Sequence, residues 1–207
     1  NAVARLKRGG LPSERQSEYL ELIDEGVIRI KEIVRQILDF SRKTPTIERL
    51  NPLDAFFAAR SLCEHRLEAR NIVLATDFET REICVEGDRG EFQQVFLNLL
   101  GNAIDACEDG ARIDCSCRLD AERVELRIRD HGCGMSPDEV SASFDLFHTT
   151  KPVGEGTGLG LSIAYSIVNR YRGNLTIESR KGEGTLVCVT LPLAKAADAE
   201  NSERDSA

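Results

Sequence analysis

The sequence predicts a protein of the α+β class, because helical and strand-like hydrophobic patterns both occur within its 207 residues. Apolar residues recur at three- and four-residue intervals in Glu91–Cys107, which indicates an amphipathic helix. Apolar and polar residues alternate in Val124–Ile128, which indicates a strand with one buried face. Two further strand-like runs flank Gly182 and Gly184, where a hairpin turn is the natural connection.

The N-terminal third has the pattern of a long helix with one apolar face. That face consists of Tyr19, Leu22, Ile23, Val27, Ile30, Ile33, Val34, Ile37 and Leu38. Ser13 is a candidate N-cap, and Thr44-Pro45 ends the helix. With Ala2–Lys7 and the turn at 9–12 it forms a helical hairpin that cannot bury its apolar stripe alone. We expect two copies to dimerise as a four-helix bundle; a plain coiled coil or intramolecular packing is the alternative.

The predicted amphipathic helix also carries a polar stripe. Asp88 is its expected N-cap, with Glu91 completing a capping box. Asn98, Asn102 and Asp105 follow at positions i, i+4 and i+7, so they share one face. Amide and carboxylate oxygens are hard ligands of the kind that Mg²⁺ prefers. The alternative is an ordinary solvated face.

A glycine-rich loop runs directly into the next predicted helix. Gly154, Gly156, Gly158 and Gly160 remove side chains where a backbone must bend and approach a ligand closely. The helix N-terminus after them presents unpaired N–H groups and the positive end of the helix dipole, which suits a phosphate. A plain turn is the alternative, and the spacing matches neither the dinucleotide-binding loop nor the P-loop.

A carboxylate ends the alternating strand, since Asp130 is followed by Gly132 and Gly134. A carboxylate there can accept a hydrogen bond from an exocyclic amine while a flat ring lies against bare backbone. Taken by itself, the segment is also an unremarkable turn.

In this order the segments resemble the nucleotide-binding motifs of the sensor histidine kinases. Asn98–Ala106 is similar to their N box, Asp130–Gly134 to the first glycine box and Phe144–Lys151 to the F box. Gly156–Leu161 and Gly182–Thr185 are similar to the second and third glycine boxes. The resemblance implies a Bergerat ATP-binding fold, a two-layer α/β sandwich with helices on one face of a mixed sheet. That superfamily also includes DNA gyrase B subunits, MutL-type repair ATPases and a heat-shock chaperone.

The resemblance implies a role for each matching residue. Nucleotide binding is expected of Asn98, Asn102, Asp105, Asp130, Gly132, Gly134, Lys151, Gly156, Thr157, Gly158, Leu159, Gly160 and Thr185. Asp130 would accept the adenine amino group, and Asn102, with Asn98, would bind Mg²⁺. Lys151 would meet the terminal phosphate as a point charge. Asn98 stands where the ATPase branches carry a water-activating glutamate, and an amide takes no proton at neutral pH, which favours a kinase over a hydrolase. Lys151 and Asn98 are thus the expected catalytic residues.

The segment Leu38–Arg42 is similar to the second helix of a histidine-kinase dimerisation and phosphoacceptor domain. However, no histidine precedes His65, so the acceptor motif is missing. We expect that the chain either starts just beyond the acceptor or naturally lacks one, and that it binds Mg·ATP without phosphorylating itself. Expected domains are 1–44, a partial hairpin; 45–193, the ATP-binding domain; and 194–207, a disordered tail.

The resemblance implies transfer of the ATP γ-phosphoryl group to a histidine and then to an aspartate of a response regulator. Expected partners are a second copy of the chain and a response-regulator receiver domain. Two alternatives stay open: a non-catalytic ATP-sensing dimerisation module and a serine kinase of the anti-sigma-factor type.

The composition of the chain bears on its partners, on membrane spans and on the state of its cysteines. A net charge of −8 argues against a nucleic-acid partner, and no apolar run is long enough to span a membrane. The seven cysteines form no metal signature, so we expect reduced thiols in the cytoplasm. Core positions are expected for Cys63, Cys84, Cys107 and Cys188, and one shared strand face for Cys115 and Cys117.

Overall fold

The computed structural model describes residues 15, 17–21, 23, 26–27, 45–79, 82–149, 151 and 157–194. These residues form two compact units: 45–140 with 164–194, interrupted at 80–81, and 141–149, 151 and 157–163 with the described positions up to 27. Most of the predicted hairpin, Gly154, Gly156 and the predicted tail from residue 195 lie outside the described residues. The domain boundaries at 44 and 193 therefore stay predictions.

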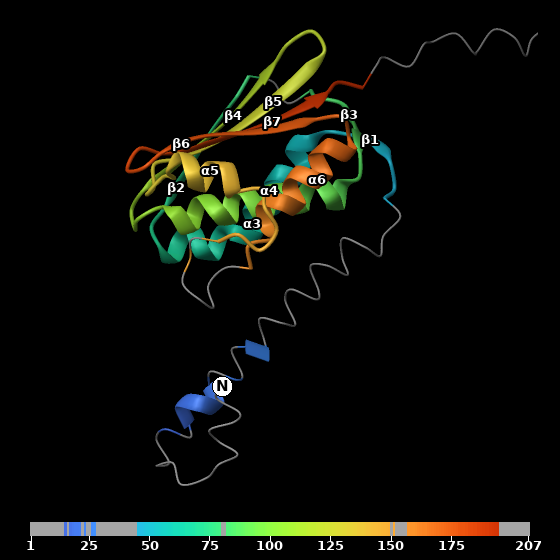
Figure 1. The fold of residues 1–207 in the computed structure, drawn as a ribbon. Coiled ribbons are helices and arrows are strands. Elements are labelled where there is room, and N and C mark those ends of the chain that lie inside the picture. Colours follow the sequence, from blue (N-terminus) through green and yellow to red (C-terminus); the bar gives the residue numbers. More distant parts are fainter. Residues whose placement is uncertain are drawn as a thin grey trace, which may run out of the picture. The chain divides into compact units, whose positions relative to one another are not determined.

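The larger unit contains a five-stranded mixed sheet (Figure 1). Its strands, in spatial order, are β2 (Val73–Phe78), β4 (Arg112–Leu119), β5 (Arg123–Asp130), β7 (Gly184–Pro192) and β6 (Asn174–Arg180). The edge strand β2 runs parallel to β4, and every other pairing is antiparallel. A separate antiparallel pair joins β1 (Glu48–Leu50) to β3 (Val85–Gly87). The predicted strand and the predicted hairpin are confirmed as β5 and as the β6–β7 connection.

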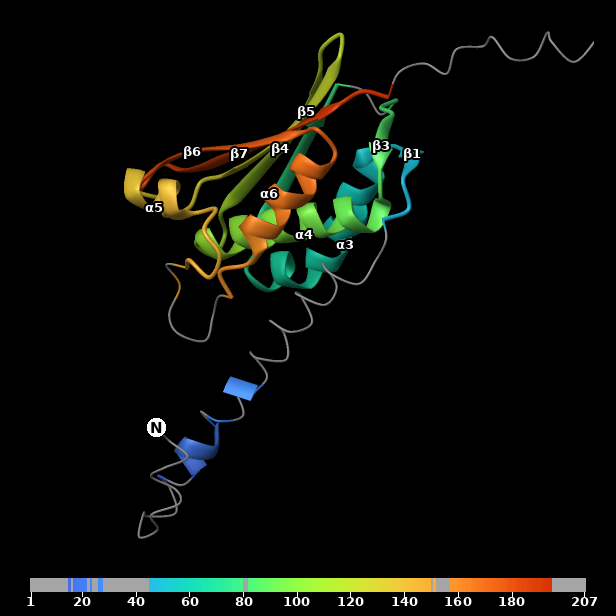
Figure 2. The same ribbon diagram turned by 45° about the vertical axis from the view of Figure 1, so that its right-hand side comes forward.

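Helices lie against one face of this sheet (Figure 2). The two long helices are α3 (Pro52–Ala69) and α4 (Arg89–Ala106), which pack against each other, and α4 also contacts β5 and β7. Shorter helices are α5 (Pro137–Ala142) and α6 (Gly160–Arg170). The predicted α+β class and two-layer sandwich are confirmed. None of the helices in the described ranges combines the length and apolar character needed to cross a membrane.

Helix α4 begins where the sequence predicts. The side chain of Asp88 caps it by accepting a hydrogen bond from the Glu91 amide at 3.0 Å. The apolar face that the spacing predicts is buried: Phe92, Val95, Phe96, Leu99, Leu100, Ala103 and Ile104. The Glu91 carboxylate accepts hydrogen bonds from Arg170 and Tyr171, which ties the end of α6 and the residue after it to the start of α4.

An aromatic cluster fills the core between the helices and the sheet. Phe56 of α3 makes edge-to-face contacts with Phe57, Phe78 and Phe96, with ring centroids 5.4–5.6 Å apart. Because Phe78 lies on β2 and Phe96 on α4, the cluster joins both helices to the parallel edge of the sheet.

We expect Phe56→Ala to lower the free energy of unfolding by about 3–5 kcal/mol, since a fully buried ring leaves a cavity when removed. Urea denaturation followed by circular dichroism measures this. The control is Leu62→Ala on the same helix, where the side chain is 62% exposed and the expected change is within about 0.5 kcal/mol. Equal effects of the two substitutions would contradict a core position for Phe56.

All seven cysteines are free thiols. Five are buried: Cys63, Cys107, Cys115, Cys117 and Cys188. Burial raises the pKa of Cys115 to about 12 and that of Cys117 to about 11, so both are protonated at neutral pH. The predicted core position of Cys84 is wrong: it is exposed, because it lies in the connection before β3 rather than on an inward face.

Candidate functional site

The buried carboxylate of Asp130 ends β5. Asp130 is only 4% exposed, and its partner in the strand register is Thr185 at the start of β7. Its Oδ1 atom accepts hydrogen bonds from the backbone N–H of Gly132 at 2.9 Å and of Thr185 at 3.1 Å. Both bonds go to the same oxygen, so Oδ2 keeps its acceptor capacity. Burial raises the pKa of this carboxyl, and the two N–H bonds oppose that rise.

The loop after Asp130 is held by close backbone packing. The Cys133 N–H donates to the Ala106 carbonyl at 3.0 Å, and the Gly182 N–H donates to the Cys133 carbonyl at 2.7 Å. The loop is therefore hydrogen-bonded on one side to the end of α4 and on the other to the β6–β7 hairpin.

Glycine is required in this loop for a structural reason that the sequence patterns do not reveal. A Cβ atom on Gly132 would lie 2.2 Å from the Ala106 carbonyl oxygen. On Gly134, with φ +60°, it would lie 1.9 Å from the Arg180 carbonyl oxygen. Both contacts are far inside van der Waals distance and both involve backbone atoms, which cannot move aside. The predicted contact of these glycines with an adenine ring stays a prediction.

The polar stripe of α4 lies as predicted, with Asn98, Asn102 and Asp105 on one face. The half-buried Asn98 accepts a hydrogen bond from Gln94 Nε2 at 3.1 Å, and Asn102 is exposed. Asp105 forms an ion pair with Arg66 of α3. Within the described ranges, no group of three or more His, Cys, Asp or Glu side chains is placed to hold a metal ion. A metal here would therefore rely on amide oxygens and on a ligand's own phosphates.

The smaller unit contains the predicted site residues Lys151, Thr157, Gly158, Leu159 and Gly160. The Phe147 N–H donates to the Gly158 carbonyl at 3.0 Å, and Gly158 has φ +67°. A Cβ on Gly158 would lie 2.4 Å from the Phe147 carbonyl carbon, so this glycine too is required by close packing. Leu159 is buried, and the Ser162 hydroxyl donates to its carbonyl at 2.9 Å.

Around that loop, the Leu159 N–H contacts Thr157 Oγ1 at 3.4 Å, and the Lys151 N–H donates to Thr149 Oγ1 at 3.2 Å. Helix α6 begins at Gly160, as the sequence predicts. Asp130, Gly132, Gly134 and Thr185 are thus brought together in the larger unit, whereas Lys151 and the described loop residues 157–160 belong to the smaller one.

Comparison with known proteins matches residues 87–195 to the family described as "Histidine kinase-, DNA gyrase B-, and HSP90-like ATPase". The chain belongs to this family. The match begins at the N-terminal end of α4 and runs past the end of β7, so it includes every predicted nucleotide-binding residue.

Individual relatives are sensor kinases. The chain is 35% identical to the two-component sensor PprA of Pseudomonas aeruginosa over 209 residues, which cover 96% of this chain and 22% of PprA. It is 32% identical to the sensor kinase CckA of Brucella abortus over 185 residues, covering 82% of this chain and 20% of CckA. The solved catalytic domain of the histidine kinase ThkA matches with a TM-score of 0.64 at 26% identity, covering 71% of this chain and 97% of that domain.

These similarities confirm the predicted resemblance to the sensor histidine kinases and the ATP-binding character of the domain. The chain spans only about a fifth of the length of PprA and CckA.

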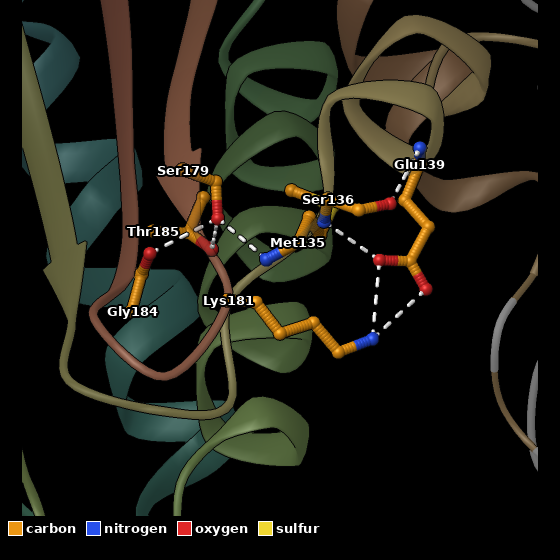
Figure 3. Close-up of polar contacts among 7 residues, drawn as sticks. All are labelled: Met135, Ser136, Glu139, Ser179, Lys181, Gly184 and Thr185. Carbon is orange, nitrogen blue, oxygen red and sulfur yellow. Dashed lines mark hydrogen bonds and ion pairs between the residues drawn. The ribbon is translucent and has the colours of Figure 1, made fainter.

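Sequence reasoning missed one polar residue of this ATPase domain. Ser179 of β6 lies opposite Thr185 of β7, and its hydroxyl oxygen lies 2.9 Å from Thr185 Oγ1 (Figure 3). The available signal was the strand period. Counting back from the hairpin turn places Ser179 and Thr185 on one face of the sheet, where Asp130 also lies.

Proposed function

We propose that this chain is the ATP-binding kinase core of a two-component sensor histidine kinase. It transfers the γ-phosphoryl group of ATP to a histidine, and the phosphoryl group then passes to an aspartate of a response regulator. The observation that carries this proposal is the buried Asp130 carboxylate, which keeps Oδ2 available as an acceptor at the start of a glycine loop that is held by backbone packing. The names of the relatives, a two-component sensor and a sensor kinase, agree with it.

In this proposal Asp130 Oδ2 accepts the exocyclic amine of adenine. Gly132 and Gly134 allow the close backbone packing that shapes the loop beside the ring, and Thr185 borders the ring. The second glycine loop, with Gly156, Thr157, Gly158, Leu159 and Gly160, binds the phosphates through backbone N–H groups at the start of α6. Lys151 supplies a positive charge to the terminal phosphate.

The α4 stripe fits Mg²⁺, because that ion commonly takes one or two protein oxygens and completes its shell with water and phosphate. Asn102 is exposed and Asn98 lies one helical turn before it, so their amide oxygens are the proposed ligands. When bound, Mg²⁺ would neutralise charge on the phosphate oxygens. Asp105 lies on the same stripe and forms an ion pair with Arg66, and we propose that it also contributes to nucleotide binding.

Asn98 also explains why the proposed activity is phosphoryl transfer rather than hydrolysis. Its side-chain oxygen already accepts a hydrogen bond from Gln94, and an amide cannot take a proton from an attacking water at neutral pH. The chain therefore holds ATP without a general base at this position. The nucleophile of the proposed reaction is the histidine of the dimerisation and phosphoacceptor domain.

The proposed partners are a second copy of the chain, joined through the N-terminal hairpin, and a response-regulator receiver domain. We place the protein in the cytoplasm, because seven free cysteines suit a reducing compartment.

Replacing Asn102 by alanine is expected to weaken ATP binding about tenfold in the presence of Mg²⁺ and to leave it nearly unchanged in EDTA, because only the metal-dependent contact is lost. Isothermal titration calorimetry of both proteins with ATP, with and without Mg²⁺, measures this. The matched control is Gln93→Ala on the same helix, which should alter neither affinity. Equal weakening of Asn102→Ala in EDTA would contradict a role in metal binding, and absence of ATP binding by the wild-type chain would contradict the proposed function.

A further inference from the structure

The hydroxyl of Ser179 makes three polar contacts at the base of the β6–β7 hairpin (Figure 3). Its oxygen lies 2.8 Å from the backbone nitrogen of Met135, 3.0 Å from the carbonyl oxygen of Gly184 and 2.9 Å from the hydroxyl oxygen of Thr185. The Ser179 hydroxyl thus joins the loop after β5, through Met135, to the first two residues of β7, Gly184 and Thr185.

These contacts determine where each proton lies. The Met135 N–H can only donate, so Ser179 accepts from it. The Gly184 carbonyl can only accept, so the single proton of the Ser179 hydroxyl goes there. Ser179 then has no proton left for Thr185. With Ser179 donating to Gly184, the Thr185 hydroxyl donates its own proton to Ser179, and both of its lone pairs stay available as acceptors.

Thr185 lies beside Asp130. The two residues are partners in the β5–β7 register, so their side chains point to the same face of the sheet. The Thr185 N–H also donates to Asp130 Oδ1, which leaves Oδ2 as the available carboxylate atom. Two side chains that are both more than 90% buried therefore present acceptors, and neither presents a donor.

The hairpin that carries Ser179 is held by a second set of contacts (Figure 3). The ammonium group of Lys181 lies 3.3 Å from Glu139 Oε2, and that same oxygen accepts the Ser136 N–H at 2.7 Å. The Gly182 N–H donates to the Cys133 carbonyl. These contacts hold the hairpin that carries Ser179 against the segment 133–139.

We propose that Ser179 is a positioning residue that fixes the Thr185 hydroxyl as a hydrogen-bond acceptor, so that this site selects a 6-aminopurine over a 6-oxopurine nucleotide. This inference rests on the proposed function, since it requires that the base lies against Asp130 and Thr185. A 6-amino group donates to acceptors of this kind. A 6-oxo group brings an acceptor against them and loses the hydrogen bond.

The test is calorimetry of ATP and inosine triphosphate, each with Mg²⁺, on the full chain and its variants. The wild-type chain should bind ATP at least about tenfold more tightly than inosine triphosphate. Ser179→Ala frees the Thr185 proton to turn toward a 6-oxo group, so the ratio of the two dissociation constants should fall about three- to tenfold. Ser179→Thr keeps the hydroxyl and should keep the ratio.

A purely structural role of Ser179 predicts a different result, in which Ser179→Ala weakens both nucleotides equally and leaves the ratio unchanged. That result overturns the inference. If Ser179→Ala does not fold, Thr185→Val decides: it removes the acceptor and should lower the ratio, and an unchanged ratio overturns the inference. A wild-type chain that binds ATP in an Asp130-dependent way but does not discriminate the bases overturns this inference alone. A chain that binds neither nucleotide overturns the proposed function with it.

Discussion

Asp130→Asn is expected to weaken Mg·ATP binding about tenfold or more while the protein stays folded. Asparagine keeps an oxygen at the position of Oδ1, so the hydrogen bonds from Gly132 and Thr185 persist. At the position of Oδ2 it places an NH₂ group, which turns an acceptor into a donor and faces the adenine amine with the wrong polarity. The loss of one hydrogen bond at a buried site, with a donor left unpaired, is worth about 1–3 kcal/mol. Calorimetry of both proteins measures it.

The same substitution should also stabilise the protein at neutral pH. Because the pKa of Asp130 is raised in the folded state, the charged carboxylate lowers the free energy of unfolding above that pKa. As the pH falls through the folded-state pKa, the folded wild type binds a proton before the unfolded chain does and gains stability. The advantage of Asp130→Asn should therefore be largest near pH 7 and should shrink toward pH 4. Urea denaturation at several pH values measures this.

These two readouts separate a ligand-binding role from a structural one. If Asp130 were only a structural acceptor for the loop, Asp130→Asn would change neither ATP affinity nor the selectivity between nucleotides. If the variant instead lost both stability and binding, the hydrogen bonds to Oδ1 would not have survived, and the assignment of Oδ2 to the ligand would be wrong.

Gly134→Ala is expected to lower the free energy of unfolding by about 2–5 kcal/mol and to abolish ATP binding. Gly134 has φ +60°, a conformation that costs an L-residue about 1–2 kcal/mol. The added methyl group would also lie 1.9 Å from the Arg180 carbonyl oxygen, and relieving that clash means moving the loop away from the hairpin. The loop after Asp130 would then lose its position, and nucleotide binding with it.

Gly182→Ala is the matched control for that prediction. Gly182 also has a positive φ, +79°, but no atom lies within 4 Å of the place where its Cβ would be. Gly182→Ala should therefore lower the free energy of unfolding by only about 1–2 kcal/mol and leave the ATP affinity nearly unchanged. Thermal unfolding by circular dichroism and calorimetry of ATP binding compare the two. Equal losses of stability would show that the close approach of Arg180 to Gly134 does not matter.

Much of the architecture was predictable from local patterns. The start of α4 at Asp88, its buried apolar face, the strand that ends at Asp130 and the hairpin at Gly182 follow from periodicity, capping and turn chemistry. These signals are reliable because each depends on residues within one or two turns of the chain. The motif order, rather than any single motif, pointed to the family that the comparisons confirm.

Other features depend on residues far apart in the sequence. Cys84 has an apolar side chain of suitable size for the core, yet its place in a connection leaves it exposed. The ion pair of Asp105 with Arg66 joins α4 to α3, and no spacing within α4 predicts it. The parallel pairing of β2 with β4 likewise joins strands that β3 and α4 separate in the sequence, and the composition of either strand does not predict it.

The sequence alone predicts the residue types of the site, because their chemistry is local. These are a carboxylate at the end of a strand, glycines before helix α6 and glycines in the β6–β7 hairpin. The identity of the oxygen that stays available on Asp130, the contact of the Thr185 hydroxyl with Ser179 and the need for glycine at 132 and 134 came only from the three-dimensional contacts. The hydrogen bonds of Cys133 with Ala106 and of Thr185 with Asp130 join residues that are 27 and 55 positions apart in the sequence, and folding alone brings those partners together.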